Sequence, residues 1–204
     1  FDEIIELAMV PFSYGNTGKI FEIFEPYQSF QEPCKAIPAE ITEITGITQN
    51  MVSGYKLDRE LIESYLTKAD IIIAHNASFD RKFMEKIFSQ ACIKPWGCSA
   101  TQINWKAEGF EGSRLGYLVA SAGFFYDRHR ALNDCYAAIE LLARPLPKSK
   151  LFALGVLLEN ARRSSWRIWA SHAPFELKDK LRRDRKSTRL NSSHTAISRM
   201  SSSA

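Results

Sequence analysis

Two segments of the chain place histidine and aspartate side chains directly before predicted helices. The first runs from His75 to Asp80 and follows the apolar run 71–74. The second runs from His129 to Asp134 and leads into a helical apolar pattern. In open α/β sheets, catalytic groups gather where strands end and helices begin, so carboxylates placed there can reach a metal ion. The spacing therefore raises the hypothesis of one acidic site built from two distant segments.

Each aspartate also has a plain structural explanation. Asp80 falls in the first turn of its predicted helix, where a negative charge favours the helix dipole. Asp134 shares a helical face with Ala138 and Leu141, so it points toward apolar packing, where a carboxylate needs a metal ion or a nearby amide. His129 is expected in the preceding loop, either facing a substrate water or simply on the surface. Taken singly, neither segment decides between chemistry and structure.

The elements that must position these residues begin with strands. Residues 4–12 and 20–27 are apolar-rich around the turn cluster 15–18, and this pattern predicts an antiparallel hairpin. The short all-apolar run 71–74 predicts a central strand buried on both faces. Ser78 is placed to cap the helix that follows, which runs to about Phe88.

Helices dominate the rest of the predicted order, which gives an α/β layout with a mixed sheet flanked by helices. An edge strand is expected at 96–100 and another strand at 166–170. The predicted helices, by periodicity, are 39–44, 48–52, 57–69, 102–106, 114–122, 130–143, 151–163 and 173–181.

The composition excludes a membrane-spanning chain and gives little weight to global charge. Among 204 residues, 45% are hydrophobic and 25% are charged, and no apolar run approaches the ~18–20 residues of a membrane span. The four cysteines form no zinc-binding spacing, which predicts reduced thiols in a cytoplasm. The formal net charge of +4 falls to +1 without residues 184–204, so it does not by itself indicate nucleic-acid binding.

Taken together, AHNASFD at 74–80 and HRALND at 129–134 resemble the second and third sequence motifs of the DEDDh-class 3′→5′ exonucleases, and in particular of proteins like the epsilon subunit of DNA polymerase III. The segments 44–48, 96–99 and 115–118 lie where those proteins have similar stretches. The resemblance covers roughly residues 3–144. It implies a ribonuclease-H-like fold and an enzyme that hydrolyses phosphodiester bonds at 3′ ends.

The resemblance also implies roles for individual residues. Asp80 and Asp134 correspond to ligands of two divalent ions, Mg²⁺ or Mn²⁺, and His129 to the general base, for which an unperturbed pKa near ~6.5 is suitable. Further residues correspond to positions that face the terminal nucleotide; for Phe79 and Ile47, plain core packing is an equal alternative. These substrate-facing candidates are His75, Asn76, Phe79 and Ile47.

The chain departs from the family pattern at the first motif. A strand carrying Asp-x-Glu is expected shortly before the segment 4–10, and it is absent from this sequence. Asp2 and Glu3 cannot replace it, because neighbouring side chains of a strand point to opposite faces. We therefore expect an N-terminally truncated domain that lacks its first strand, binds its metal ions poorly and is nearly inactive, although the intact parent is an enzyme.

The predicted domain order is an exonuclease domain at 1–144, a linker at 145–150, a small C-terminal extension at 151–183 and a tail at 184–204. Back-translation of residues 184–194 gives a string that resembles a sequencing adapter, which predicts a non-native tail; a natural Ser/Arg-rich tail is the alternative. Aromatic and basic residues alternate in the extension, and they either stack on single-stranded nucleic acid or pack on the main domain.

Three functions compatible with these motifs remain open. The first is proofreading or repair of DNA at single-stranded or frayed 3′ ends, with a DNA polymerase as a candidate partner. The second is trimming of RNA by the same chemistry, which substrates with and without a 2′-hydroxyl separate. The third is a non-catalytic nucleic-acid-binding module on the same fold.

Overall fold

The computed structural model describes residues 3–127, 130–163, 165–167 and 198–200. The chain divides into two compact units, 1–161 and 162–204. In the second unit, β7 (Ser165–Arg167) pairs antiparallel with β8 (Ser198–Met200). The helix predicted at 173–181 lies outside the described residues, as does most of the predicted adapter-derived tail. None of the helices in the described ranges is long and apolar enough to cross a membrane.

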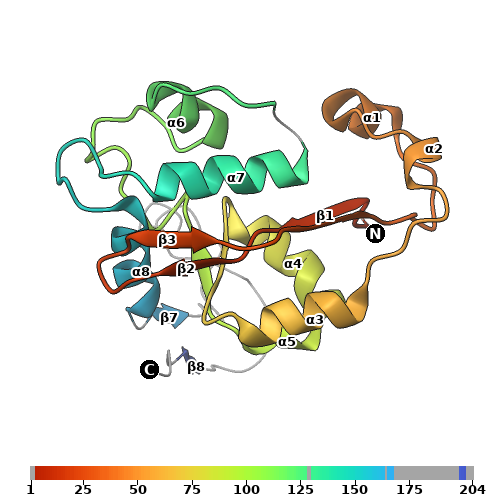
Figure 1. Ribbon diagram of the computed structural model, residues 1–204, viewed down its shortest axis with the longest axis horizontal. Helices are drawn as coiled ribbons and strands as arrows, with labels where there is room; N and C mark the ends of the chain where they lie inside the picture. The colour runs from red at the N-terminus through yellow and green to blue at the C-terminus, as the bar shows by residue number, and fades with distance from the viewer. Residues whose placement is uncertain (1–2, 128–129, 164, 168–197, 201–204) are drawn as a thin grey trace, which may run out of the picture. The chain divides into compact units, whose positions relative to one another are not determined.

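The predicted hairpin is confirmed, and it is interrupted once. β1 (Glu6–Met9) pairs antiparallel with β4 (Tyr27–Phe30), and β2 (Phe12–Tyr14) pairs antiparallel with β3 (Ile20–Ile23). The break falls at Pro11, because proline has no backbone N–H to donate to a ladder. Its carbonyl still accepts from the backbone N–H of Phe24 at 2.9 Å, so the two ladders follow one another along the same pair of chain segments (Figure 1).

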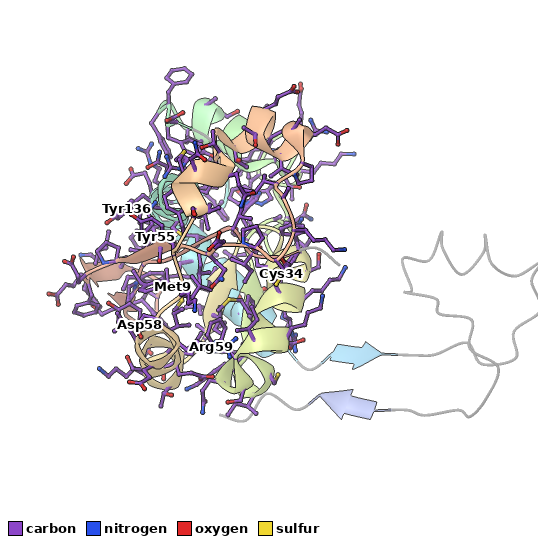
Figure 2. The ribbon with its side chains drawn as sticks, turned by 90° about the vertical axis from the view of Figure 1, so that its right-hand side faces the viewer. Met9, Cys34, Tyr55, Asp58, Arg59 and Tyr136 are labelled. Carbon is purple, nitrogen blue, oxygen red and sulfur yellow. The ribbon has the colours of Figure 1, made fainter. Side chains whose placement is uncertain are left out.

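Three helices lead from the hairpin to the next strand: α1 (Ala39–Thr45), α2 (Gln49–Val52) and α3 (Arg59–Lys68). Gly46 ends α1 in the left-handed conformation, with φ 70°. Asp58, labelled in Figure 2, caps α3 by accepting from the backbone N–H of Leu61 at 3.0 Å. Such a cap satisfies one of the free N–H groups at a helix start.

The central strand lies between two apolar clusters. β5 (Ile72–Ala74) pairs parallel with β6 (Trp96–Cys98). Alternate side chains of a strand point to opposite faces, and accordingly Ile71 and Ile73 pack on one cluster while Ile72 packs on the other. The all-apolar run thus packs on an apolar cluster at each of its two faces, as predicted, although these isoleucines are half-buried. The connection between β5 and β6 contains α4 (Ala77–Ile87) and α5 (Ser89–Ile93).

The larger cluster is built from the last three helices of the first unit, α6 (Leu115–Ser121), α7 (Ala131–Leu142) and α8 (Ala153–Arg162). Gly18 and Gly155 allow the hairpin turn to touch α8, because a Cβ on Gly155 would lie 2.5 Å from the carbonyl oxygen of Thr17. Leu146, in the predicted linker, is buried in this cluster. The boundary between the two units falls after Ala161, and the predicted boundaries at 144 and 150 stay predictions.

Two predictions about local structure were wrong. Residues 102–106 form turns, since Ile103 and Trp105 both enter the same core, and residues two apart on a helix do not share a face. The residue before α4 is Asn76, not Ser78. Among the described residues the strands pair in two-stranded ladders, parallel for β5 with β6 and antiparallel for the others. The α/β class itself is confirmed, with parallel and antiparallel pairs beside helices.

Candidate active site

A left-handed turn positions Asp80 beyond the end of β5. Asn76 has φ 69°, a conformation that asparagine tolerates better than most residues. Its carbonyl accepts from the backbone N–H of Phe79 at 2.9 Å, and its side-chain oxygen accepts from the hydroxyl of Ser78 at 3.0 Å. This turn reverses the chain directly into α4, so that Asp80 stands in the first turn of that helix, half-buried.

Glu6 of β1 fixes the start of α7, the helix that carries Asp134. The carboxylate of Glu6 accepts from the backbone N–H of Ala131 at 3.0 Å and from Nη2 of Arg130 at 3.0 Å. Burial raises the pKa of Glu6, but the hydrogen bonds from Arg130 and Ala131 outweigh it, so the pKa lies below its usual value. Glu6 therefore remains charged and caps a helix far from it in sequence, in whose first turn Asp134 lies.

The structure brings Asp80 and Asp134 within electrostatic reach of each other. Burial raises the pKa of Asp80, its own backbone N–H lowers it, and the charge of Asp134 raises it again, leaving it above the usual value. Two half-buried carboxylates that repel each other are stabilised when a divalent cation binds between them. The prediction that both aspartates lie close together is consistent with this interaction.

The residues present fit a divalent ion in part. The described residues contain no group of three or more His, Cys, Asp or Glu side chains that could hold a metal ion. Mg²⁺, however, is commonly bound through one or two protein carboxylates, with waters and substrate phosphates completing its shell. Asp80 and Asp134 would supply two such oxygen ligands, so their carboxylates are compatible with Mg²⁺ or Mn²⁺ in a site that offers few protein oxygens.

Cys135 lies near three carboxylates, those of Asp134, Asp80 and Glu6. Burial and the charges of Asp134, Asp80 and Glu6 together raise the pKa of its thiol to about 12. The thiol donates to the carbonyl oxygen of Ala8 at 3.6 Å. Cys135 is therefore a neutral packing residue between α7 and β1, surrounded by negative charge. It is one of four free cysteines.

His75 is held by the protein on both sides of its ring. Nδ1 lies 2.9 Å from the hydroxyl of Ser99, and Nε2 lies 2.7 Å from the carbonyl oxygen of Ser113. The carbonyl can only accept, so Nε2 carries the proton and Nδ1 accepts from Ser99, which is fully buried. Burial lowers the pKa of His75 despite opposing contributions from Ser113 and Asp134. His75 joins the ends of β5 and β6 to the loop before α6, and its substrate-binding role stays a prediction.

The remaining substrate-facing candidates differ in exposure. Phe79 is 59% exposed and contacts Phe83 with ring centroids 5.1 Å apart, so one face of its ring is open to a ligand. Asn76 is exposed beside it. Ile47 is only 1% exposed, which agrees with the packing alternative; its contact with a terminal base stays a prediction. His129 lies outside the described residues, so its role also stays a prediction.

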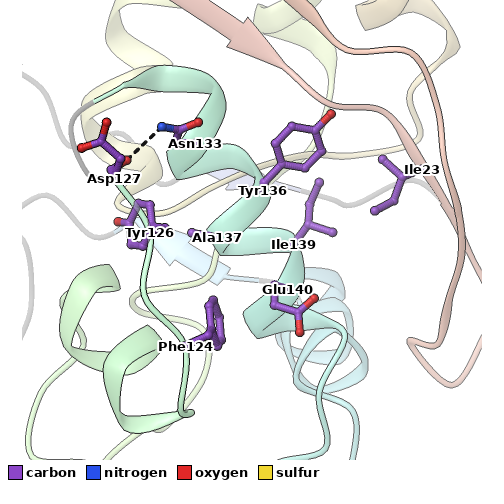
Figure 3. Close-up of a pocket in the computed structure, with 9 residues that line it drawn as sticks. All are labelled: Ile23, Phe124, Tyr126, Asp127, Asn133, Tyr136, Ala137, Ile139 and Glu140. Atoms are coloured by element: carbon purple, nitrogen blue, oxygen red, sulfur yellow. Dashed lines mark hydrogen bonds between the residues drawn. The ribbon is translucent and has the colours of Figure 1, made fainter.

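Two residues near Asp134 were missed by the sequence analysis. Glu6 could have been found, because an acid within the apolar strand 4–10 needs a partner when it is buried. Tyr126 donates its hydroxyl to Oδ1 of Asp134 at 2.8 Å, and nothing in the sequence pattern indicates it, since it lies in an irregular loop. Figure 3 shows Tyr126 beside the start of α7.

Comparison with known proteins gives a family and a fold. The family model described as Exonuclease (RNase_T) matches residues 1–142, which confirms the predicted resemblance and enzyme class. A DNA polymerase III PolC-type protein of Bacillus subtilis is 34% identical over 154 residues, covering 72% of this chain and 10% of that protein. The corresponding protein of Clostridium perfringens is 28% identical over 155 residues, covering 73% of this chain and 10% of that protein.

Solved structures show the same fold at low identity. Exonuclease X in complex with 5′ overhanging duplex DNA superposes with a TM-score of 0.52 at 23% identity, covering 74% of this chain and 90% of that one. A full-length 3′-exonuclease gives a TM-score of 0.56 at 18% identity, covering 74% of this chain and 55% of that one. The chain spans about a tenth of the length of the PolC-type relatives named above.

Proposed function

We propose, since the chain belongs to the exonuclease family, that it carries the nuclease site of a 3′→5′ exonuclease that hydrolyses phosphodiester bonds at the 3′ ends of DNA. The observation that supports this most directly is the electrostatic interaction between Asp80 and Asp134 at the first turns of α4 and α7. Their positions correspond to the two aspartates of the matched motifs, and both acids are half-buried.

Asp80 and Asp134 would hold two divalent ions, Mg²⁺ or Mn²⁺. When bound, such ions stabilise charge on an attacking water and on the leaving 3′-oxygen. The exposed ring of Phe79 is placed to stack on a base next to the scissile bond. Because α4 begins directly after the turn at Asn76, Phe79 and Asp80 both lie in the first turn of that helix. By resemblance, His129 is the general base that takes the proton of the water.

The number of carboxylates sets the expected strength of metal binding. The Asp-x-Glu at 58–60 lies at the start of α3 and not on a strand, and the third acid near Asp80 and Asp134, Glu6, is engaged by Arg130 and Ala131. Each ion would therefore rely on few protein oxygens. We expect the 204-residue chain by itself to bind Mg²⁺ weakly and to turn over slowly; brisk turnover in Mg²⁺ would contradict this argument.

DNA is the favoured substrate, with RNA as the alternative. Relatives named as PolC-type DNA polymerase III and a structural neighbour bound to DNA favour 2′-deoxy ends. We expect a cytoplasmic DNA polymerase to supply such ends. A further neighbour is a 3′-exonuclease described with a histone mRNA stem-loop, at a TM-score of 0.54 and 16% identity. Oligonucleotides that differ only in the terminal 2′-hydroxyl separate the two substrates.

The experiment is a single-turnover assay with protein in excess over a single-stranded oligonucleotide labelled at its 5′ end. In Mn²⁺ we expect slow, stepwise shortening from the 3′ end with release of nucleoside monophosphates, abolished by a chelator and by Asp134→Asn or Asp80→Asn. Asp70→Asn is the matched control, because Asp70 is exposed just before β5. Binding of the oligonucleotide without any cleavage would favour the non-catalytic module, and cleavage unchanged by either substitution would contradict the assigned site.

A further inference from the structure

The loop between α6 and α7 is attached to the first turn of α7 and to Arg144, which follows that helix. Nη1 of Arg144 donates to the carbonyl oxygen of Ala122 at 2.7 Å, and its guanidinium lies 4.7 Å from the ring centroid of Phe124. Further along, the side-chain amide of Asn133 donates to the carbonyl oxygen of Asp127 at 3.1 Å, the dashed line in Figure 3. The loop is therefore fixed on both sides of Tyr126.

Tyr126 uses this fixed loop to reach the carboxylate of Asp134. Its hydroxyl lies 2.8 Å from Oδ1 of Asp134, and both side chains are half-buried. A hydroxyl that donates to a carboxylate forms a charge-assisted bond, which is roughly twice as strong as a neutral one. The ring of Tyr126 lines a hollow of about 370 Å³ together with Phe124, Tyr136 and Ile139, so ring and hydroxyl have separate contacts.

The hydrogen bond from Tyr126 restricts the orientation of the Asp134 carboxylate. Without a cation, Asp134 is repelled by Asp80, and an aspartate side chain can relieve such repulsion by rotating about its two side-chain torsions. Anchoring Oδ1 to Tyr126 opposes that rotation. In metal sites, losing a partner that orients a ligating side chain typically lowers metal affinity or activity by about 10–100-fold.

We propose that Tyr126 is a positioning residue that holds the carboxylate of Asp134 in the orientation needed to bind a divalent ion, an inference that rests on the proposed function. It does not touch the reacting atoms in this role. Its effect is on the concentration of metal needed to fill the site, and the chemistry at saturating metal proceeds unchanged. This distinguishes it from a residue that takes part in the reaction itself.

The test measures metal binding directly, by the broadening of backbone amide NMR signals near Asp80 and Asp134 as Mn²⁺ is added. Tyr126→Phe removes the hydroxyl and keeps the ring in its hollow. We expect this variant to need about 10-fold more Mn²⁺ for the same broadening, and its cleavage rate to return to that of the unmodified chain when Mn²⁺ is raised. Tyr65→Phe is the matched control, because Tyr65 also donates its hydroxyl to an oxygen, the carbonyl of Glu25 at 3.1 Å.

Each outcome separates the role of Tyr126 from the proposed function. If Asp134→Asn abolishes the broadening while Tyr126→Phe follows the unmodified chain, the positioning role is wrong and the metal site stands. If Tyr126→Phe lowers the melting temperature without changing the Mn²⁺ requirement, the tyrosine is structural only. If the unmodified chain shows no broadening centred on Asp80 and Asp134, both the metal site and the positioning role are overturned.

Discussion

Replacing Glu6 by alanine tests the connection between β1 and the helix that carries Asp134. The side chain of Glu6 is 5% exposed, and its carboxylate accepts from Gln28, from Arg130 and from the backbone N–H of Ala131. Truncating one partner of a buried ion pair typically costs about 3–5 kcal/mol. Here the side chain of Arg130 is 34% exposed, so water partly replaces the lost carboxylate and the cost of the broken pair falls to about 1–2 kcal/mol.

The helix start adds to that cost. Loss of a capping acceptor for Ala131 typically destabilises by about 1 kcal/mol, so we expect Glu6→Ala to lower the free energy of unfolding by about 2–3 kcal/mol in total. Urea unfolding is the assay, and with a slope of about 2 kcal/mol per molar the midpoint moves by about 1–1.5 M. Glu22→Ala, at an exposed position on β3, is the control.

The same carboxylate predicts a pH dependence. The pKa of Glu6 in the folded chain lies below its usual value of 4.5, so its stabilising contribution is complete above pH 4.5 and is lost as pH falls through the lower folded pKa. The difference in unfolding free energy between the unmodified chain and Glu6→Gln should therefore shrink in acid. For the substitution by alanine, a decrease in unfolding free energy below about 1 kcal/mol, or equal to the decrease for Glu22→Ala, would refute the capping argument.

Three further predictions use other parts of the structure. Because the pKa of His75 is lowered in the fold, unfolding free energy should decline as pH falls below about 6.5, and His75→Gln should flatten that decline in urea titrations. Gly155→Ala should destabilise the chain by about 1–3 kcal/mol, because the new Cβ would lie 2.5 Å from the carbonyl oxygen of Thr17; an unchanged melting temperature would contradict the close contact. Phe79→Ala should weaken oligonucleotide binding by about 5–100-fold through lost stacking, whereas Phe125→Ala, at a residue 86% exposed, should leave fluorescence-anisotropy titrations unaltered.

Patterns that depend on local spacing could be read from the sequence. The apolar run 71–74 predicted a strand, and it packs on two clusters at once. The hairpin followed from turn residues between alternating apolar stretches. The two motifs predicted Asp80 and Asp134 close to helix starts, and each lies in the first turn of its helix; their sharing of metal ions stays a prediction.

Contacts between distant segments could not be read in this way. The carboxylate of Glu6 caps a helix 125 residues later in the chain, and the bond from Tyr126 to Asp134 depends on how an irregular loop lies on α7. Residues 102–106 have a helical pattern, yet burial of Ile103 and Trp105 in one core imposes turns. Here tertiary packing outweighs local preference.

The most direct test of the shared metal site is a crystal of the chain soaked with Mn²⁺ and measured for anomalous scattering. The proposed function predicts an anomalous peak in contact with carboxylate oxygens of both Asp80 and Asp134, and no such peak in Asp134→Asn. Mn²⁺ bound elsewhere, with these two carboxylates contacting no ion at saturating metal, would contradict the assignment of a nuclease centre to this site.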